Sequence, residues 1–130
     1  MKLQNAKAHI PTDDFFNANA IINHASDYFH LERGEMKSDS RQLEIVKARH
    51  IAMYACWKTI GMSCANIGSF FCRDHATVLH AITSVKNQVE LNSIYRRQVS
   101  EIMEGVKNLI PESAIEEYEE VFQENDFYTN

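Results

Sequence analysis

The sequence predicts an all-α fold of five to six helices around one hydrophobic core, with a helix-turn-helix near its middle. Three observations carry this prediction. Apolar residues recur at helical spacing in successive segments, and no segment shows the sustained alternation of a β-strand. The size is also suitable, because 130 residues with 45% hydrophobic composition can form one compact domain. We assign residues 1–110 to this domain and residues 111–130 to an acidic C-terminal helix or tail.

The first helix is expected to begin at Pro11, which fits the first turn of a helix, and to end between His30 and Gly34. Asp13 in its first turn favours the positive end of the helix dipole. Its apolar positions at helical spacing are Ile21, Ile22, Ala25, Tyr28 and Phe29. The polar segment 34–40 that follows is typical of a turn.

A central helix is expected over residues 41–60, with Asp39 or Ser40 as its cap. Its periodic apolar residues are Val46, Ile51, Tyr54 and Trp57. Gly61 supplies a stop at the C-terminal end, where glycine is favoured.

The helix-turn-helix is predicted from a short helix over residues 64–71, a charged corner at 72–75 and a longer helix over residues 74–91. Ser63 and Asp74 are suited to cap these two helices. The inner side of the short helix carries Ile67, Phe70 and Phe71, and that of the longer helix carries Val78, Ile82, Val85 and Val89. In a DNA-binding helix-turn-helix, the start of the second helix faces base edges.

Two further helices complete the expected fold. One covers residues 93–109 and is predicted to bury Ile94, Ile102, Val106 and Leu109. Pro111 is placed to start the last one, which carries an apolar ridge of Ile115, Tyr118 and Phe122 on an acidic surface.

The net charge of −5 is unevenly distributed along the chain. Residues 101–130 carry nine acids and one base, whereas residues 33–97 carry ten bases and five acids. This basic body is compatible with DNA binding of modest, salt-sensitive affinity. No run approaches the roughly 20 apolar residues that a membrane span needs, and the N-terminus has no apolar signal core. We therefore expect a cytoplasmic protein that does not bind membranes.

Metal and enzyme sites are disfavoured by the sequence. Cys56, Cys64 and Cys72 fall at helical apolar positions, which predicts reduced, buried thiols. A metal site of Cys72, His75 and His80 lacks paired ligand spacing. A Cys72–His75 nucleophile pair is conceivable, but the start of a helix explains their positions as well. The chain has no GxxxxGK[ST], GxSxG or HExxH motif, so we expect no enzyme, cofactor or metal.

The polar residues gathered at the start of the second helix are candidates for reading DNA. Asp74 can accept from a cytosine amino group, His75 can bond a purine edge, and the Ala76 methyl can contact a thymine methyl. The candidates for phosphate contact there are Arg73, Thr77 and His80. Taken singly, Asp74 has the alternative role of a helix cap and His75 that of a surface histidine.

The central helix and its approach add three more candidates. Arg49 and His50 are expected on the helix face away from Val46 and Trp57. Arg41, on a polar approach to the helix, is suited to enter a narrow minor groove. Each is also explained as a solvated surface charge.

The sequences ARHIAMY (48–54), IG (67–68) and RDHATVLHA (73–81) closely resemble the C-terminal DNA-binding domain of the bacterial replication initiator DnaA. The similarity is strong over residues 48–81 and extends over about 21–109. It implies a helix-turn-helix akin to that of the Trp repressor, which reads the duplex called the DnaA box.

The resemblance also implies roles for individual residues. By this similarity, Arg41 enters the minor groove, while Asp74, His75 and Ala76 approach bases in the major groove. The implied backbone contacts are Arg49, His50, Arg73, Thr77 and His80. Family members usually have glutamine at 50, threonine or serine at 76, and one or two glycines before the RDH sequence. The resemblance does not include the ATPase of DnaA, so we expect no nucleotide binding.

Two functions follow as hypotheses. The first is sequence-specific binding of double-stranded DNA at DnaA-box-like sites by a standalone regulator of replication or transcription, encoded by a bacterium, a phage or another mobile element. The alternative is a protein-interaction module on a retained helix-turn-helix scaffold, with Ile115, Tyr118 and Phe122 of the acidic C-terminal helix contacting a protein partner.

Overall fold

A computed structural model describes residues 10–110 of the chain, and within this range the fold is all-α, as predicted. The helices are α2 (Thr12–Tyr28), α3 (Leu43–Ala55), α4 (Cys64–Phe71), α5 (His75–Leu91) and α6 (Ser93–Leu109). A 3₁₀ helix, η1 (Arg33–Lys37), precedes α3, and a π-helical segment, η2 (Cys56–Ile60), continues it. The expected helix after Pro111 lies outside the described residues.

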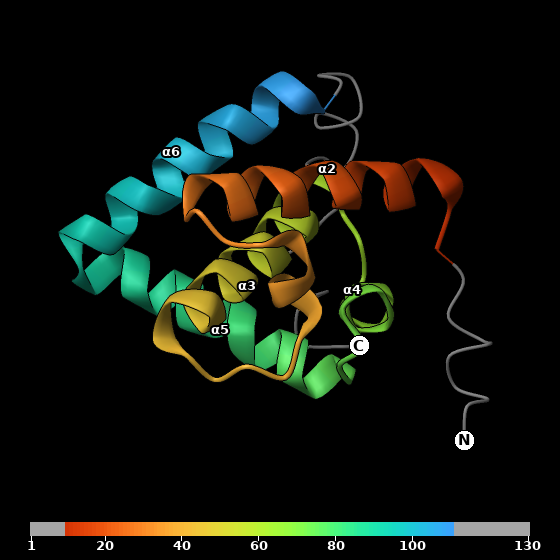
Figure 1. Ribbon diagram of the computed structural model, residues 1–130, viewed down its shortest axis with the longest axis horizontal. Coiled ribbons are helices and arrows are strands. Elements are labelled where there is room, and N and C mark those ends of the chain that lie inside the picture. Colours follow the sequence, from red (N-terminus) through yellow and green to blue (C-terminus); the bar gives the residue numbers. More distant parts are fainter. Residues whose placement is uncertain (1–9, 111–130) are drawn as a thin grey trace.

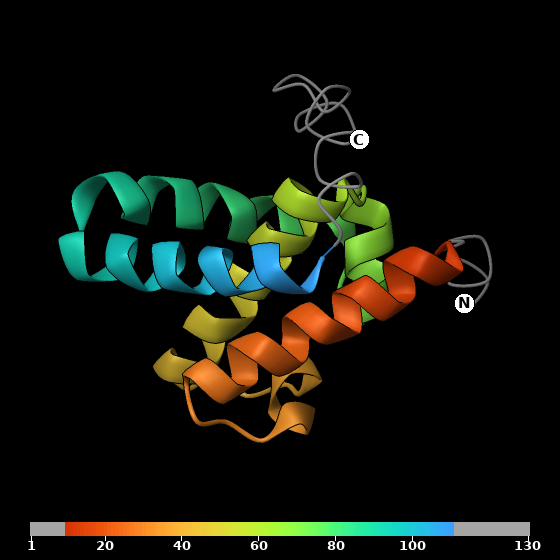
Figure 2. The same ribbon diagram turned by 90° about the horizontal axis from the view of Figure 1, so that it is seen from above.

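Helix α3 lies at the centre of the fold and packs against both α2 and α5. Figure 1 shows α2 crossing one side of α3, with α5 on the other side and α4 near the start of α5. Helices α5 and α6 form an antiparallel pair, which Figure 2 shows side by side. Helix α6 then returns over α2, so the two long terminal helices of the described range close one core.

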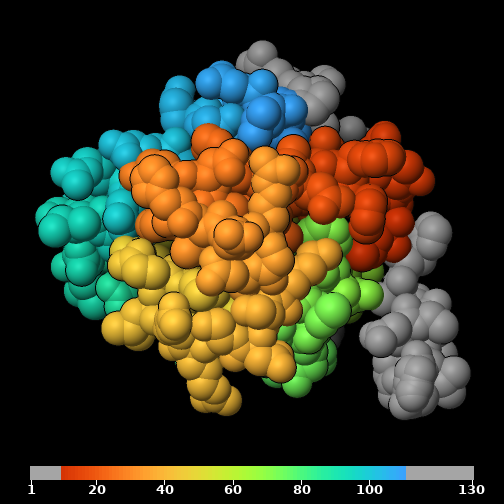
Figure 3. Space-filling model, in the orientation of Figure 1, coloured from red at the N-terminus to blue at the C-terminus, as the bar shows by residue number. Residues whose placement is uncertain are grey.

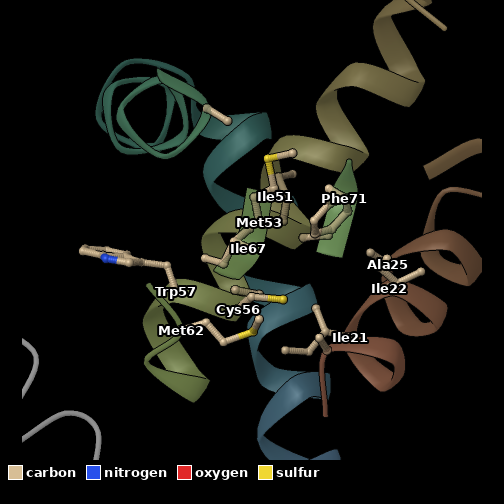
Figure 4. Close-up of a cluster of buried hydrophobic side chains, with 14 of the residues drawn as sticks. Ile21, Ile22, Ala25, Ile51, Met53, Cys56, Trp57, Met62, Ile67 and Phe71 are labelled. Atoms are coloured by element: carbon tan, nitrogen blue, oxygen red, sulfur yellow. The ribbon is translucent and has the colours of Figure 1, made fainter. Parts of the chain in front are cut away.

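The core is built from aliphatic, aromatic and sulfur-containing side chains, with contributions from every helix (Figure 4). Ile21 and Ala25 of α2, Ile51 of α3 and Cys56 of η2 all belong to this cluster and are fully buried. Phe71 at the end of α4 is also fully buried, so the helix-turn-helix is anchored directly in this core. Each buried aliphatic or aromatic side chain of this size contributes roughly 1.5–3 kcal/mol through removal of its surface from water.

The central helix differs from the prediction at both ends. It begins at Leu43 rather than Arg41, and its first turn receives no side-chain cap from the preceding residue, Gln42. Neither Asp39 nor Ser40 caps it, because both belong to a hydrogen-bonded loop before the helix. At the other end, the π-helical segment stops at Gly61, whose φ of 81° lies in the left-handed region, so the predicted glycine stop is confirmed.

The α5–α6 pair is joined by a single residue, Asn92, whose side-chain oxygen accepts from the Tyr95 amide at 2.9 Å. The predicted buried stripe of α6 is correct at Ile102 and Val106. It is wrong at Ile94 and Leu109, which are 58% and 48% exposed, because the face of the helix that packs on the core carries their neighbours Tyr95 and Ile110 instead. Within residues 10–110, no helix is long and apolar enough to cross a membrane.

Candidate nucleic-acid interface

The helix-turn-helix turn is a tight corner between α4 and α5. Ser63 accepts from the Asn66 amide at 3.1 Å and caps α4, as predicted. Helix α4 ends at Cys72, whose φ of 60° is left-handed, and the Arg73 amide then donates back to the Gly68 carbonyl at 2.8 Å. A Cβ atom on Gly68 would lie 2.4 Å from the Arg73 carbonyl oxygen, so this close approach requires glycine.

The start of α5 presents its polar residues to solvent. Asp74 caps the helix, with Oδ1 accepting from the Thr77 amide at 2.8 Å. Hydrogen bonding from the side chain and the amide of Thr77, together with the charge of nearby His75, holds the pKa of the Asp74 carboxyl below its usual value. His75, Ala76 and Thr77 are all exposed in the first turn of α5, and His80 is exposed about one turn further along. The capping prediction for Asp74 is confirmed, and its second carboxylate oxygen retains acceptor capacity.

Arg49 does not lie on a solvated face, because its side chain is only 6% exposed. Its guanidinium donates to three carbonyl oxygens of η1 and the loop that follows it: Nε to Met36 at 3.0 Å, and Nη2 to Ser38 at 3.0 Å and to Ser40 at 3.2 Å. Desolvation by burial, and secondly the charge of Arg73, lower the pKa of Arg49. The prediction of an outward Arg49 is therefore wrong, since the loop covers it; its contact with DNA stays a prediction.

Arg73 reaches from the turn to the same loop. Its Nη2 donates to the Ser38 carbonyl at 2.6 Å and its Nη1 to the Phe71 carbonyl at 3.1 Å. Arg73 and Arg49 meet Arg41, which is exposed, at a hollow of about 480 Å³. The hollow is lined by Asp39, Ser40, Arg41, Val46, Arg49, Cys72 and Arg73. Figure 3 shows the segment between α2 and α3, in orange and yellow, at the surface beside green residues of the helix-turn-helix.

His50 and His80 form a separate pair between α3 and α5. His50 is half-buried and lines a shallow cleft of about 380 Å³ with Leu43, Lys47 and Tyr95 among its neighbours. Desolvation by burial, followed by the charges of His80 and Arg49, lowers the pKa of His50 to about 4. His50 is therefore neutral near pH 7, and one ring nitrogen can donate while the other accepts.

The nine predicted site residues thus fall into three adjoining groups. Three arginines surround the hollow, four residues from Asp74 to Thr77 form the exposed start of α5, and two histidines lie between α3 and α5. The sequence did not indicate the loop carbonyls that receive Arg49 and Arg73, because backbone acceptors have no signature in the side chains. The close approach at Gly68 could have been suspected from a glycine placed inside a helix.

The cysteines are partly as predicted. Cys56 and Cys64 are buried free thiols, and burial raises the pKa of both. Cys72 is also free but exposed, so the prediction of a buried thiol is wrong there; the left-handed corner turns this residue outward from the core. Among residues 10–110, no group of three or more His, Cys, Asp or Glu side chains is arranged to hold a metal ion.

Comparisons with known proteins find relatives in one family. A family model of the bacterial DnaA protein helix-turn-helix matches residues 18–85. The chain is 40% identical over 83 residues to the chromosomal replication initiator protein DnaA of Bacteroides thetaiotaomicron, covering 63% of this chain and 18% of that protein. It is 41% identical over 78 residues to the DnaA protein of Flavobacterium psychrophilum, covering 59% and 16% of the two chains.

A solved structure is similar as well. The crystal structure of a DNA replication initiation factor superposes with a TM-score of 0.69 at 28% sequence identity, covering 75% of this chain and 30% of that one. The chain spans less than a fifth of the length of the two DnaA proteins. Because the family model matches more than half of its residues, including α4, the turn and the start of α5, the chain belongs to the bacterial DnaA helix-turn-helix family.

Proposed function

We propose that this domain binds double-stranded DNA at DnaA-box-like sites and acts as a regulator of replication or transcription. One observation supports the proposal above all others: the three-arginine hollow adjoins the exposed first turn of α5, with Arg73 next to Asp74 in the chain. A surface that combines cationic groups with an exposed helix start can contact phosphates and base edges together.

The first turn of α5 is the proposed reading surface in the major groove. His75 can donate to or accept from a purine, and the Ala76 methyl can lie against a thymine methyl. Asp74 can serve as cap and reader at once, because Oδ1 bonds the Thr77 amide while Oδ2 can accept from a cytosine amino group. Helix α5 thereby fixes the base-reading residues by its own backbone geometry.

The proposed backbone contacts surround this turn. Arg73, Thr77 and His80 flank the reading residues, and neutral His50 can donate a hydrogen bond to a phosphate. Arg49 contributes its charge to the hollow from a buried position. Arg41, exposed at the rim, is the proposed minor-groove residue.

Fluorescence anisotropy with a DnaA-box duplex and a scrambled duplex, each at two salt concentrations, tests the proposal. We expect tighter binding of the box duplex and a steep loss of affinity with salt for both. His75→Ala should reduce the preference for the box by roughly 5- to 150-fold, because one good base contact is worth about 1–3 kcal/mol. Arg97→Ala, at an exposed position on α6, serves as the control variant. Equal affinity for the two duplexes would exclude sequence-specific reading.

The alternative proposal, a protein-interaction module, rests on the ridge Ile115, Tyr118 and Phe122 and its flanking glutamates. These residues lie outside the described range. The alternative predicts that a partner is retained by the full chain and lost when the three ridge residues are changed to serine, while changes at Asp74–Thr77 have no effect on it. Loss of function on mutation of the α5 start alone would contradict it.

A further inference from the structure

The end of η1 and the loop between η1 and α3 are folded around one buried guanidinium. Arg49 donates to the carbonyl oxygens of Met36, Ser38 and Ser40, so three acceptors within five residues converge on one side chain. Arginine presents its donors in a fixed planar fork, unlike the point charge of lysine. The arrangement therefore specifies the path of the loop and not only its proximity to a positive charge.

Arg73 connects the same loop to the helix-turn-helix. It donates to the Ser38 carbonyl and to the Phe71 carbonyl, so one guanidinium spans the loop before α3 and the end of α4. The Ser38 carbonyl accepts from both arginines. Through this shared acceptor, the loop and the turn that leads into α5 are held at a fixed separation.

Arg41 is the residue that this connection presents. Two hydrogen bonds order the loop around it. The Ser40 amide, just before Arg41, donates to Ser38 Oγ, and the Gln42 amide, just after it, donates to Ser40 Oγ, both at 3.2 Å. Arg41 itself is exposed at the rim of the hollow, and within residues 10–110 it forms no hydrogen bond or ion pair. Its backbone is thus fixed while its guanidinium is available.

We propose that Arg49 and Arg73 are positioning residues, which fix Arg41 relative to the first turn of α5 so that both fit one duplex at a set spacing. This inference rests on the proposed DNA-binding function. If the loop is ordered before binding, the complex does not lose affinity to the entropy cost of ordering it. Only a duplex whose grooves match the fixed spacing of Arg41 and the first turn of α5 gains from this. The two arginines then contribute to sequence preference without touching a base.

Lysine substitutions separate this role from simple attraction to phosphate. Arg49→Lys and Arg73→Lys retain the charge but lose the fork. We expect each variant to lose about five- to tenfold more affinity for the DnaA-box duplex than for the scrambled duplex. Arg97→Lys, exposed on α6, is the matched control and should change neither affinity. Equal weakening on both duplexes, or no change on either, would overturn the positioning role.

Hydrogen exchange of the DNA-free protein supplies an independent readout. In both lysine variants, the Ser40 and Gln42 amides should exchange at least about tenfold faster, while core amides of α5 keep their protection. Because Arg73 is only half-buried, Arg73→Lys keeps the test available if Arg49→Lys fails to fold. Unchanged exchange of the loop amides would show that Arg49 and Arg73 do not order the loop, and would refute the inference. If the loop exchanges faster but the original chain prefers neither duplex, the proposed function is refuted, while the ordering of the loop by the two arginines still holds.

Discussion

Gly68 and Arg73 approach each other more closely than any side chain at position 68 would allow. The Arg73 amide donates to the Gly68 carbonyl at 2.8 Å, and a Cβ on Gly68 would meet the Arg73 carbonyl oxygen at 2.4 Å. That oxygen belongs to the backbone and cannot rotate away. This contact sets how tightly the turn folds against α4, and hence where Arg73 and the start of α5 lie.

Gly68→Ala should therefore destabilise the domain. We expect a loss of about 1–3 kcal/mol in the free energy of unfolding, typical of an inserted methyl group that forces a backbone shift. Urea denaturation measures it. Gly34→Ala is the matched control, because a Cβ atom at Gly34 would meet no other segment within 4 Å, and it should change stability by less than about 0.5 kcal/mol. Equal effects of the two substitutions would contradict the steric argument.

Cys72→Gly should stabilise the domain. Cys72 has a φ of 60°, a left-handed conformation that costs a side chain roughly 1 kcal/mol and costs glycine nothing. Its side chain is exposed, so little packing is lost, while the greater freedom of glycine in the unfolded chain offsets part of the gain. We expect a net gain of about 0.5 kcal/mol in the free energy of unfolding. Cys72→Ala is the control, because alanine has the same unfavourable left-handed conformation at this position. An equally large gain with alanine would show that the stabilisation does not come from relief of backbone strain.

The short helix and the second helix of the motif could be predicted almost to the residue. Ser63 and Asp74 each accept a hydrogen bond from the amide three residues later, so a short stretch of sequence contains both the acceptor and the donor of the cap. Such local signals need no tertiary information. The start of the central helix was wrong because Asp39 and Ser40, equally good caps by type, belong to a loop that is organised around Arg49 from 9 to 13 residues away.

Burial was harder to predict than helix position. Ile94 is apolar, but the face of α6 that turns to the core carries its neighbour Tyr95 instead. Arg49 is the opposite case, a charged residue that is buried because three carbonyl oxygens satisfy it. In both cases the outcome depends on which distant backbone lies alongside, and the side-chain pattern of a single helix does not contain that information.

His50 should make the stability of the domain depend on pH. The pKa of His50 is lowered from 6.5 to about 4 in the folded state, so the unfolded chain binds this proton more readily. The stabilising contribution is complete above about pH 6.5 and is lost as the pH falls from there towards 4. Allowing for solvent at the part-exposed ring, we expect a loss on the order of 1–2 kcal/mol.

Urea denaturation at about pH 7 and at about pH 4.5 measures this loss. His50→Gln is the matched control, because glutamine retains a donor and an acceptor but does not titrate. The difference between the two chains removes the contribution of the other ionisable groups. If the original chain and the variant lose the same stability over this range, the neutral state of His50 in the fold would be disproved.

Residues 111–130 should weaken DNA binding through their charge. This segment carries seven carboxylates and no lysine or arginine, so its presence lowers the net charge that approaching DNA meets. Deleting it should tighten binding of both duplexes about threefold at roughly 0.05 M salt, with little change at roughly 0.3 M, where charges are screened over a few ångströms. A full-length variant with the seven acids changed to their amides is the matched control. It should behave like the deletion if charge is the cause. Tighter binding by the deletion alone would assign the effect to the bulk or the contacts of the segment. Unchanged affinity in both variants would refute the prediction.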